Sequence, residues 1–296
     1  MTEMEKFHID NLIDLHCHFG PDTLGSKAAP NVGVRPVKQI EDARENGFKA
    51  ILLKSQTFPT VQLADTLNEI YPDFTVLSGM TCDYYAGGLN VQLVECALMM
   101  GAKIIWMPTL NSTIDMQTSN FTGLDKPGIR LMDDNDKLLP EVYEIFDLCK
   151  KYDAVFATGH VTKKETYALV REFAKEGKVL VTHAGCAVAG PLLNLEETVE
   201  LADMGAMIEL TAQQAIDIEG REPGWTTEYM SEWIRAIGPE RVVLTTDYGF
   251  DEKAVPLPAP GFIDFLEKLY KEGGFTLEEL EIMASKNPAW LCNIKL

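Results

Sequence analysis

The residues best suited to chemistry in this chain are histidines placed beside apolar runs. The sequence contains five histidines, and four of them stand at or near the carboxyl end of a short apolar run: His16, His18, His160 and His183. Asp247 ends a further run of the same kind. Neutral imidazole nitrogens together with a carboxylate suit a borderline divalent ion such as Zn²⁺. We therefore expect these five residues to form a metal site, whereas His8 is interpreted as an ordinary core or surface histidine.

The elements that must position these residues are strands that alternate with helices. Apolar runs occur at residues 12–19, 50–55, 75–80, 102–108, 154–160, 178–184, 206–211 and 241–247, and segments with helical spacing lie between them. Strand–helix alternation implies parallel strands with right-handed crossovers. Eight such units predict an α/β fold, a (β/α)8 TIM barrel formed by residues 1–296 as a single domain, with an extra C-terminal helix.

An open, doubly wound sheet is the alternative fold, but the glycine-rich phosphate turn that it often carries is missing after the first strand. The segments that follow strands are long, notably residues 20–36, 109–140, 212–226 and 248–260, whereas those that precede strands are short. In a barrel the long segments lie on the C-terminal face, where active sites form. The sequence therefore predicts a site at the carboxyl ends of the strands.

Alternation along the first strand predicts which way its side chains face. It places His16 and His18 on one face together with Asp14, and turns Ile13, Leu15 and Cys17 toward the helices. The same alternation points Lys54, at the end of the second strand, toward the barrel axis. Burial there lowers the pKa of a lysine and makes its amine reactive. Three interpretations remain open for Lys54: a carbamate that bridges two metal ions, an ion pair with Asp14 or Asp247, and a Schiff base.

Composition limits the partners of the chain. Its 45 acidic residues outnumber the 26 lysines and arginines, giving a net charge of −19. Such a chain repels phosphate backbones and anionic lipids, so we expect a small-molecule substrate and neither nucleic acid nor membrane as a partner. The six cysteines are scattered without a CxxC pair, and no signal-like segment opens the sequence, which favours a cytoplasmic location. The composition also allows a homo-oligomer.

The pattern resembles the amidohydrolase superfamily of metal-dependent hydrolases over nearly the whole chain. The resemblance lies in His-x-His on the first strand, one histidine on each of the fifth and sixth strands, and Asp247 on the eighth. Residues 282–291, with Asn287-Pro-Ala, also resemble the helix that closes the family's barrels. The resemblance implies that His16, His18 and Asp247 hold one metal ion and that His160 and His183 hold a second.

One departure from the family concerns the residue that bridges the two ions. That lysine or glutamate usually ends the fourth strand, where this chain has Trp106-Met-Pro-Thr instead. Some members take the bridging residue from the second strand, where Lys54 stands. If Lys54 does not bridge, the resemblance implies a mononuclear site in which His183 contacts the substrate. Zn²⁺ is the expected ion, with Mn, Fe, Co or Ni as alternatives.

The implied activity is metal-assisted hydrolysis of a small amide, lactone or ester. A bound ion lowers the pKa of water from ~16 toward ~7. Asp247 would take the proton of that water and pass it to the leaving group, with His183 as a further catalytic candidate. Phosphoester hydrolysis, decarboxylation and a non-catalytic metal-containing binding protein are the alternatives. Candidate substrate-binding residues are Arg35, Tyr84 and Asn90, which lie in segments that follow predicted strands.

Overall fold

The computed structural model describes residues 7–22, 33–118, 126–187, 189–219 and 222–296. Eight parallel strands form one sheet in sequence order from β1 to β8. They are β1 (Leu12–Cys17), β2 (Phe48–Leu53), β3 (Thr75–Thr81), β4 (Ile104–Trp106), β5 (Val155–Ala157), β6 (Val179–Val181), β7 (Met207–Thr211) and β8 (Val242–Thr245). Each observed strand overlaps one of the eight apolar runs, so the strand predictions are confirmed.

Backbone hydrogen bonds join the first and last strands and nearly close the sheet. The amide of Asp247 donates to the carbonyl of His16 over 2.9 Å, and the amide of His18 donates to the carbonyl of Tyr248 over 2.8 Å. Cys17 and Tyr248 form an isolated parallel bridge at the same place. The predicted (β/α)8 barrel is therefore confirmed, and the residues that close it are neighbours of the predicted metal ligands.

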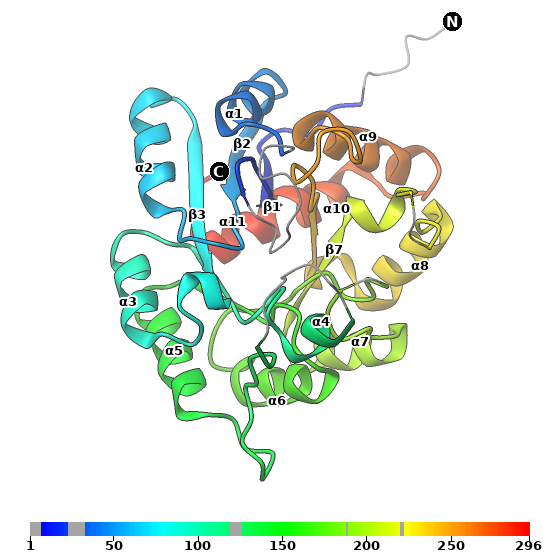
Figure 1. The fold of residues 1–296 in the computed structure, drawn as a ribbon. Helices are drawn as coiled ribbons and strands as arrows, with labels where there is room; N and C mark the ends of the chain where they lie inside the picture. Colours follow the sequence, from blue (N-terminus) through cyan, green and yellow to red (C-terminus); the bar gives the residue numbers. More distant parts are fainter. Residues whose placement is uncertain (1–6, 23–32, 119–125, 188, 220–221) are drawn as a thin grey trace, which may run out of the picture.

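Helices surround this barrel (Figure 1). The longer ones are α1 (Pro36–Glu45), α2 (Val61–Ile70), α3 (Val91–Met99), α5 (Pro140–Lys151), α6 (Lys163–Phe173), α7 (Leu195–Asp203), α8 (Thr227–Ile237) and α9 (Pro258–Lys271). Short helical segments are η1 (Tyr84–Ala86), α4 (Thr113–Thr118), η2 (Ala212–Ala215) and η3 (Pro239–Arg241). None of the helices in the described part of the chain is long and apolar enough to cross a membrane.

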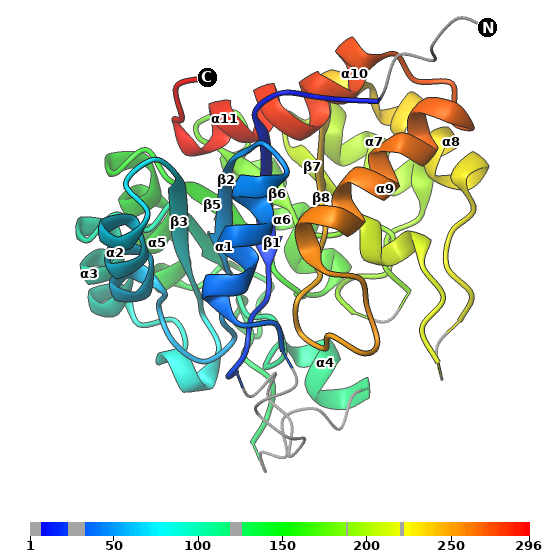
Figure 2. The same ribbon diagram turned by 90° about the horizontal axis from the view of Figure 1, so that it is seen from above.

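The predicted C-terminal helix is present and plugs one end of the barrel. It consists of α10 (Leu277–Glu281), a π-helical turn at Ile282–Lys286 and α11 (Asn287–Cys292). Figure 2 shows α11 at one end of the barrel and α4 at the opposite end. Ala289 and Leu291 pack into the same buried cluster as the side chains that fill the barrel. The Asn287 side chain donates hydrogen bonds to the carbonyls of Pro239 and Val242, which fixes the plug to β8.

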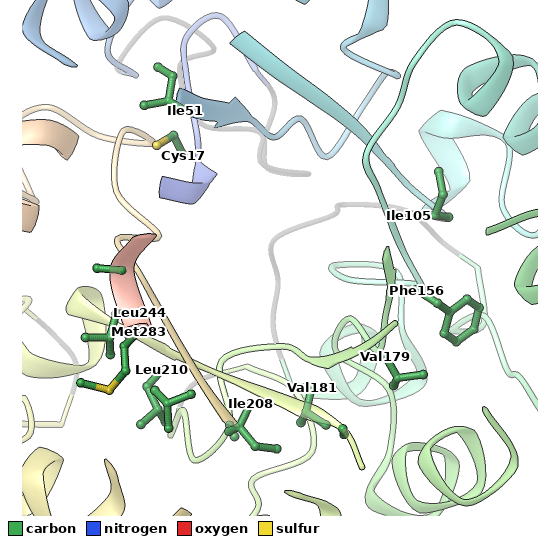
Figure 3. Close-up of a cluster of buried hydrophobic side chains, with 14 of the residues drawn as sticks. Cys17, Ile51, Ile105, Phe156, Val179, Val181, Ile208, Leu210, Leu244 and Met283 are labelled. Atoms are coloured by element: carbon green, nitrogen blue, oxygen red, sulfur yellow. The ribbon is translucent and has the colours of Figure 1, made fainter. Parts of the chain in front are cut away.

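Buried apolar side chains form two separate layers. One fills the barrel and includes Leu52, Ile104 and Trp106. The other lies between the strands and the helices, and Figure 3 shows members of it, such as Ile51 and Ile105, on the outer side of the strands. Adjacent residues of a strand alternate between the two layers. Nearly every strand position is therefore buried, and most of these positions carry an apolar side chain. This explains why the strands read as continuous apolar runs.

The predicted facing of the first strand was partly wrong. Ile13 and Leu15 belong to the cluster inside the barrel, whereas Cys17 belongs to the outer layer as expected. Asp14 does not share the face of the histidines, since its carboxylate bonds to the Cys17 thiol and the Thr246 hydroxyl. The reason is a break in register between Asp14 and Cys17 where β1 pairs with β2. Such an irregularity interrupts the period of two on which the prediction relied.

Candidate metal centre

The predicted ligands come together because they stand at one end of parallel strands. His16 lies in β1 and His18 follows that strand by one residue. Lys54 follows β2 directly, and Asp247 comes two residues after β8. His160 and His183 follow β5 and β6 in the same way. All six side chains are buried.

Three of these residues form a compact group of donor atoms. His16, His18 and Asp247 each offer one ligand atom, and these atoms lie within 4.8 Å of one another. Asp247 Oδ1 is 3.1 Å from His16 Nε2 and 3.0 Å from His18 Nε2. Burial lowers the pKa of His18 to about 4, although the Asp247 carboxylate opposes that shift. The His18 ring is thus neutral at pH 7, which is the form that binds metal.

Glu209 fixes the orientation of the His16 ring by contacting Nδ1, the nitrogen on the opposite side of the ring from Asp247. Its Oε1 lies 3.0 Å from His16 Nδ1, and its Oε2 accepts a hydrogen bond of 2.9 Å from the His183 amide. Despite complete burial, which opposes ionisation, the pKa of Glu209 falls to about 2 because of His16 and these hydrogen bonds. An ionised carboxylate only accepts, so Nδ1 carries a proton, and a neutral ring would then present the Nε2 lone pair to a metal ion.

The donor atoms of His16 and Asp247 indicate whether a cation fits between them. His16 Nε2 and Asp247 Oδ1 face each other across 3.1 Å, and Lys54 Nζ lies 2.8 Å from the same nitrogen. The pKa of Asp247 lies well below its usual range: burial opposes ionisation, but the neighbouring histidines, led by His16, outweigh it. A neutral His16 ring and the ionised Asp247 would both present lone pairs to a shared cation. The donor set therefore fits a divalent ion bound by imidazole and carboxylate.

His160 and His183 form a second pair beside this group. Their Nε2 atoms are 2.8 Å apart. Asp115, in α4, lies 2.5 Å from His160 Nδ1 and thereby directs His160 Nε2 toward His183. The pKa of His183 is lowered to about 3, mainly by burial and secondarily by His160, so this ring is neutral at pH 7. Its Nδ1 has no hydrogen-bond partner among the described residues.

Lys54 contacts this centre through its amine. Its Nζ lies 2.8 Å from His16 Nε2 and 5.1 Å from the centre of the Trp106 ring. Burial lowers the pKa of Lys54, while nearby carboxylates, Asp247 first among them, oppose this shift. Within the described residues, no carboxylate lies within ion-pair distance of Nζ, so the interpretation of Lys54 as a direct ion pair with Asp14 or Asp247 does not describe this structure.

The backbone is strained at two of the candidate residues. His183 has a φ of 26° and Asp247 a φ of 56°, in the left-handed region that side chains other than glycine rarely adopt. Asp14 supports the second of these turns, since its Oδ1 accepts from the amides of both His16 and Thr246. Strained residues held by surrounding bonds are frequent at functional sites. This geometry supports a functional role for both turns.

Glu209 and Asp115 were missed by the sequence reasoning. Glu209 carries a signal that could have found it, because it is the charged residue of the apolar run at 206–211 and its position alternates toward the barrel interior. Asp115 carries none, since it lies in the long segment after β4 among other polar residues. Both contacts join residues far apart in the chain, which spacing rules do not detect.

The three candidate substrate residues lie outside this cluster of contacts. Arg35 is exposed and precedes α1. The Tyr84 hydroxyl donates to the carbonyl of Pro127 over 2.7 Å. The Asn90 side chain caps α3 by accepting from the amide of Leu93. Tyr84 and Asn90 thus have structural contacts of their own, and binding of substrate by any of the three stays a prediction.

The sequence matches one family model. The model described as a family of unknown function (DUF6282) matches residues 11–209, more than half of the chain, and the chain belongs to this family. The matched range contains the four candidate histidines and Lys54 but ends before Asp247. No curated protein sequence matches the chain.

Solved structures with the same fold are amidohydrolase-type proteins, which confirms the resemblance at the level of fold. An amidohydrolase from Pseudomonas aeruginosa has a TM-score of 0.63 at 14% identity, covering 96% of each chain. A probable 2-pyrone-4,6-dicarboxylic acid hydrolase from Acinetobacter baumannii, with citric acid bound, has a TM-score of 0.63 at 12% identity, covering 96% of this chain and 99% of that one. A dihydroxybenzoic acid decarboxylase from a Polaromonas species, with manganese and the inhibitor 2-nitroresorcinol, has a TM-score of 0.57 at 10% identity, covering 97% and 98%.

Proposed function

We propose that this member of the DUF6282 family is a metal-dependent hydrolase that cleaves a small amide, lactone or ester. The observation that carries the proposal is the buried group of His16, His18 and Asp247, whose ligand atoms lie within 4.8 Å of one another. Its position at the carboxyl ends of the strands is where barrel enzymes carry their active sites. The amidohydrolase-type fold neighbours support the same activity.

His16, His18 and Asp247 would hold one divalent ion, and His160 and His183 would contribute to a second. When bound, such an ion lowers the pKa of a water molecule and polarises the carbonyl under attack. We propose Zn²⁺ because neutral imidazoles dominate the donor set. Manganese is the first alternative, since one structure of the same fold contains it.

The chain's own residues have distinct roles in this proposal. Asp247 is ionised and at the edge of the group, with its side chain 11% exposed, so it can accept a proton from the attacking water and return it to the leaving group. Glu209 and Asp115 hold the rings of His16 and His160 in one orientation, which avoids reorganisation during the reaction. His183 would bind the second ion or, if only one ion is present, contact the substrate.

Lys54 is proposed to carry a carbamate. Its buried amine, with a lowered pKa, would attack CO₂, form a nitrogen–carbon bond and release one proton. The product has a carboxylate in place of an ammonium, and it would supply oxygen ligands near His16. Intact-protein mass spectrometry under non-denaturing conditions tests this, because the carbamate adds the mass of CO₂ and is lost on acidification.

The test of the proposed function is metal analysis followed by a substrate panel. Purified protein is expected to contain a transition-metal ion and to hydrolyse at least one compound in a panel of lactones, esters and N-acyl amino acids. Protein that neither contains nor takes up such an ion would refute the proposal. Activity limited to phosphoesters would replace it with phosphoester hydrolysis.

Decarboxylation is the second candidate, because the compact donor group found among the described residues has three members and a decarboxylase shares the fold. A mononuclear centre in the purified protein, together with CO₂ release from dihydroxybenzoates and no hydrolysis, would favour it. Metal retained without turnover of any compound would favour a binding protein.

A further inference from the structure

A cavity on the outside of the barrel is separate from the metal centre. It has a volume of about 140 Å³ and lies between α8, α9 and η2. Its walls are mainly apolar and include Trp225, Met230, Phe265 and Leu269. None of the candidate metal ligands lines it. In size it compares with an engineered apolar cavity of roughly 150 Å³ in another protein, which binds benzene.

Tyr248 lines this cavity, and its hydroxyl group forms no hydrogen bond with another described residue. Tyr248 as a whole residue is 1% exposed. Its backbone amide donates to the Thr246 hydroxyl, and its backbone carbonyl accepts from the His18 amide. Among the described residues, the Tyr248 hydroxyl has no hydrogen-bond partner. Buried tyrosine hydroxyls usually have one, so a molecule in the cavity that reaches this hydroxyl would supply the missing partner.

Charge at the opening indicates that such a molecule is neutral. Asp264 and Lys268 line the cavity from α9, and both are exposed. One carboxylate and one ammonium give the opening no net charge. A ligand with a formal charge would therefore gain little there, whereas an apolar ring would gain from leaving water for the walls of Trp225 and Phe265.

We propose that this cavity is a second small-molecule site, which takes a neutral single-ring alcohol. The ring would lie among Trp225, Met230 and Phe265, and its hydroxyl would pair with the hydroxyl of Tyr248. This site goes beyond the proposed hydrolase activity. Because Tyr248 follows Asp247 directly and its carbonyl accepts from the His18 amide, the ligand would bind behind the segment that carries part of the metal centre.

The experiment compares phenol with toluene, which differ in the group that meets Tyr248. Binding to the full-length chain is followed by tryptophan fluorescence and by calorimetry, with and without a metal chelator. We expect one saturable site for each compound and about 2- to 10-fold tighter binding of phenol, the range expected for one net hydrogen bond. Tyr248→Phe should remove this preference without weakening the binding of toluene. Tyr143→Phe, the same change at an exposed residue of α5, is the control and should retain the preference for phenol.

Variants that fill the cavity test its location. Ala215 on η2 and Thr227 on α8 line the cavity and are half-buried, so Ala215→Phe and Thr227→Phe place a ring in it from two sides. Each is expected to weaken both compounds at least tenfold while circular dichroism stays unchanged. The proposal is overturned if neither compound binds the natural chain, if the folded filling variants bind normally, or if Tyr248→Phe retains the preference for phenol. The readout is binding, so failure of the hydrolase proposal would leave this result unaffected.

Discussion

Replacing Glu209 by glutamine is the most direct test of how the centre holds a metal ion. The carboxylate is fully buried and accepts from His16 Nδ1, from the His183 amide and from the Thr245 hydroxyl, at 3.0, 2.9 and 3.0 Å. An amide keeps one acceptor oxygen and presents an NH₂ group to a donor, so at least one of these bonds is lost. Loss of a hydrogen bond to a charged acceptor costs about 1.5–3 kcal/mol.

The consequence should be seen in metal affinity. If Glu209 orients His16 for a metal ion, Glu209→Gln should weaken binding by about 10- to 100-fold, which is the range for partners of ligating histidines. At about 1.4 kcal/mol for each factor of ten, this range agrees with the loss of one such bond. The assay is a competition titration of the metal-free protein against a chelator of known affinity, with circular dichroism to confirm folding.

Glu165 provides a matched control. It is also buried, and its carboxylate accepts from the amides of Leu131 and Thr162 and from the Thr162 hydroxyl, none of which belongs to a candidate metal ligand. Glu165→Gln should lower the stability of the fold but leave metal affinity unchanged. The reasoning would be refuted by a folded Glu209→Gln protein that binds metal as tightly as the natural chain, or by equal losses of affinity in the two variants.

Four further predictions address the same centre. Asp247→Asn in fully metallated enzyme should lower kcat by about 10²- to 10⁴-fold with a smaller change in KM, and retention of most of kcat would exclude its role in proton transfer. Lys54→Ala should lose the second equivalent of metal in elemental analysis, whereas unchanged two-metal occupancy would exclude a bridging carbamate. Asp14→Asn should destabilise the fold by about 1–3 kcal/mol in urea unfolding, because it leaves a buried donor among His16, Cys17 and Thr246 unpaired; unchanged stability would contradict this. Removal of the metal should lower the free energy of unfolding by about 2.7 kcal/mol, compared with protein in free metal at 100 times its Kd. An equal Tm with and without metal would contradict the proposed site.

The barrel was predictable because its pattern is local. Each strand of a barrel is buried on both faces, so it stands out as an apolar run, and every run overlaps an observed strand. The positions of His16, His18, Lys54 and Asp247 at the ends of these runs were equally visible. The parallel strands of a barrel end at the same face. The positions of these residues at the strand ends were therefore enough to predict that they lie near one another.

The side-chain partners were decided by the tertiary structure. Glu209 reaches His16 across 193 residues, and Asp115 reaches His160 across 45. The facing of Ile13 and Leu15 depends on a break in register between two strands, which no pattern within one strand encodes. The sequence by itself thus determined which residues stand at the mouth of the barrel, since that follows from the order of runs along the chain. Which nitrogen of His16 faces Asp247, and whether Lys54 meets a carboxylate or an imidazole, depends on distances between strands that exist only once the barrel has closed.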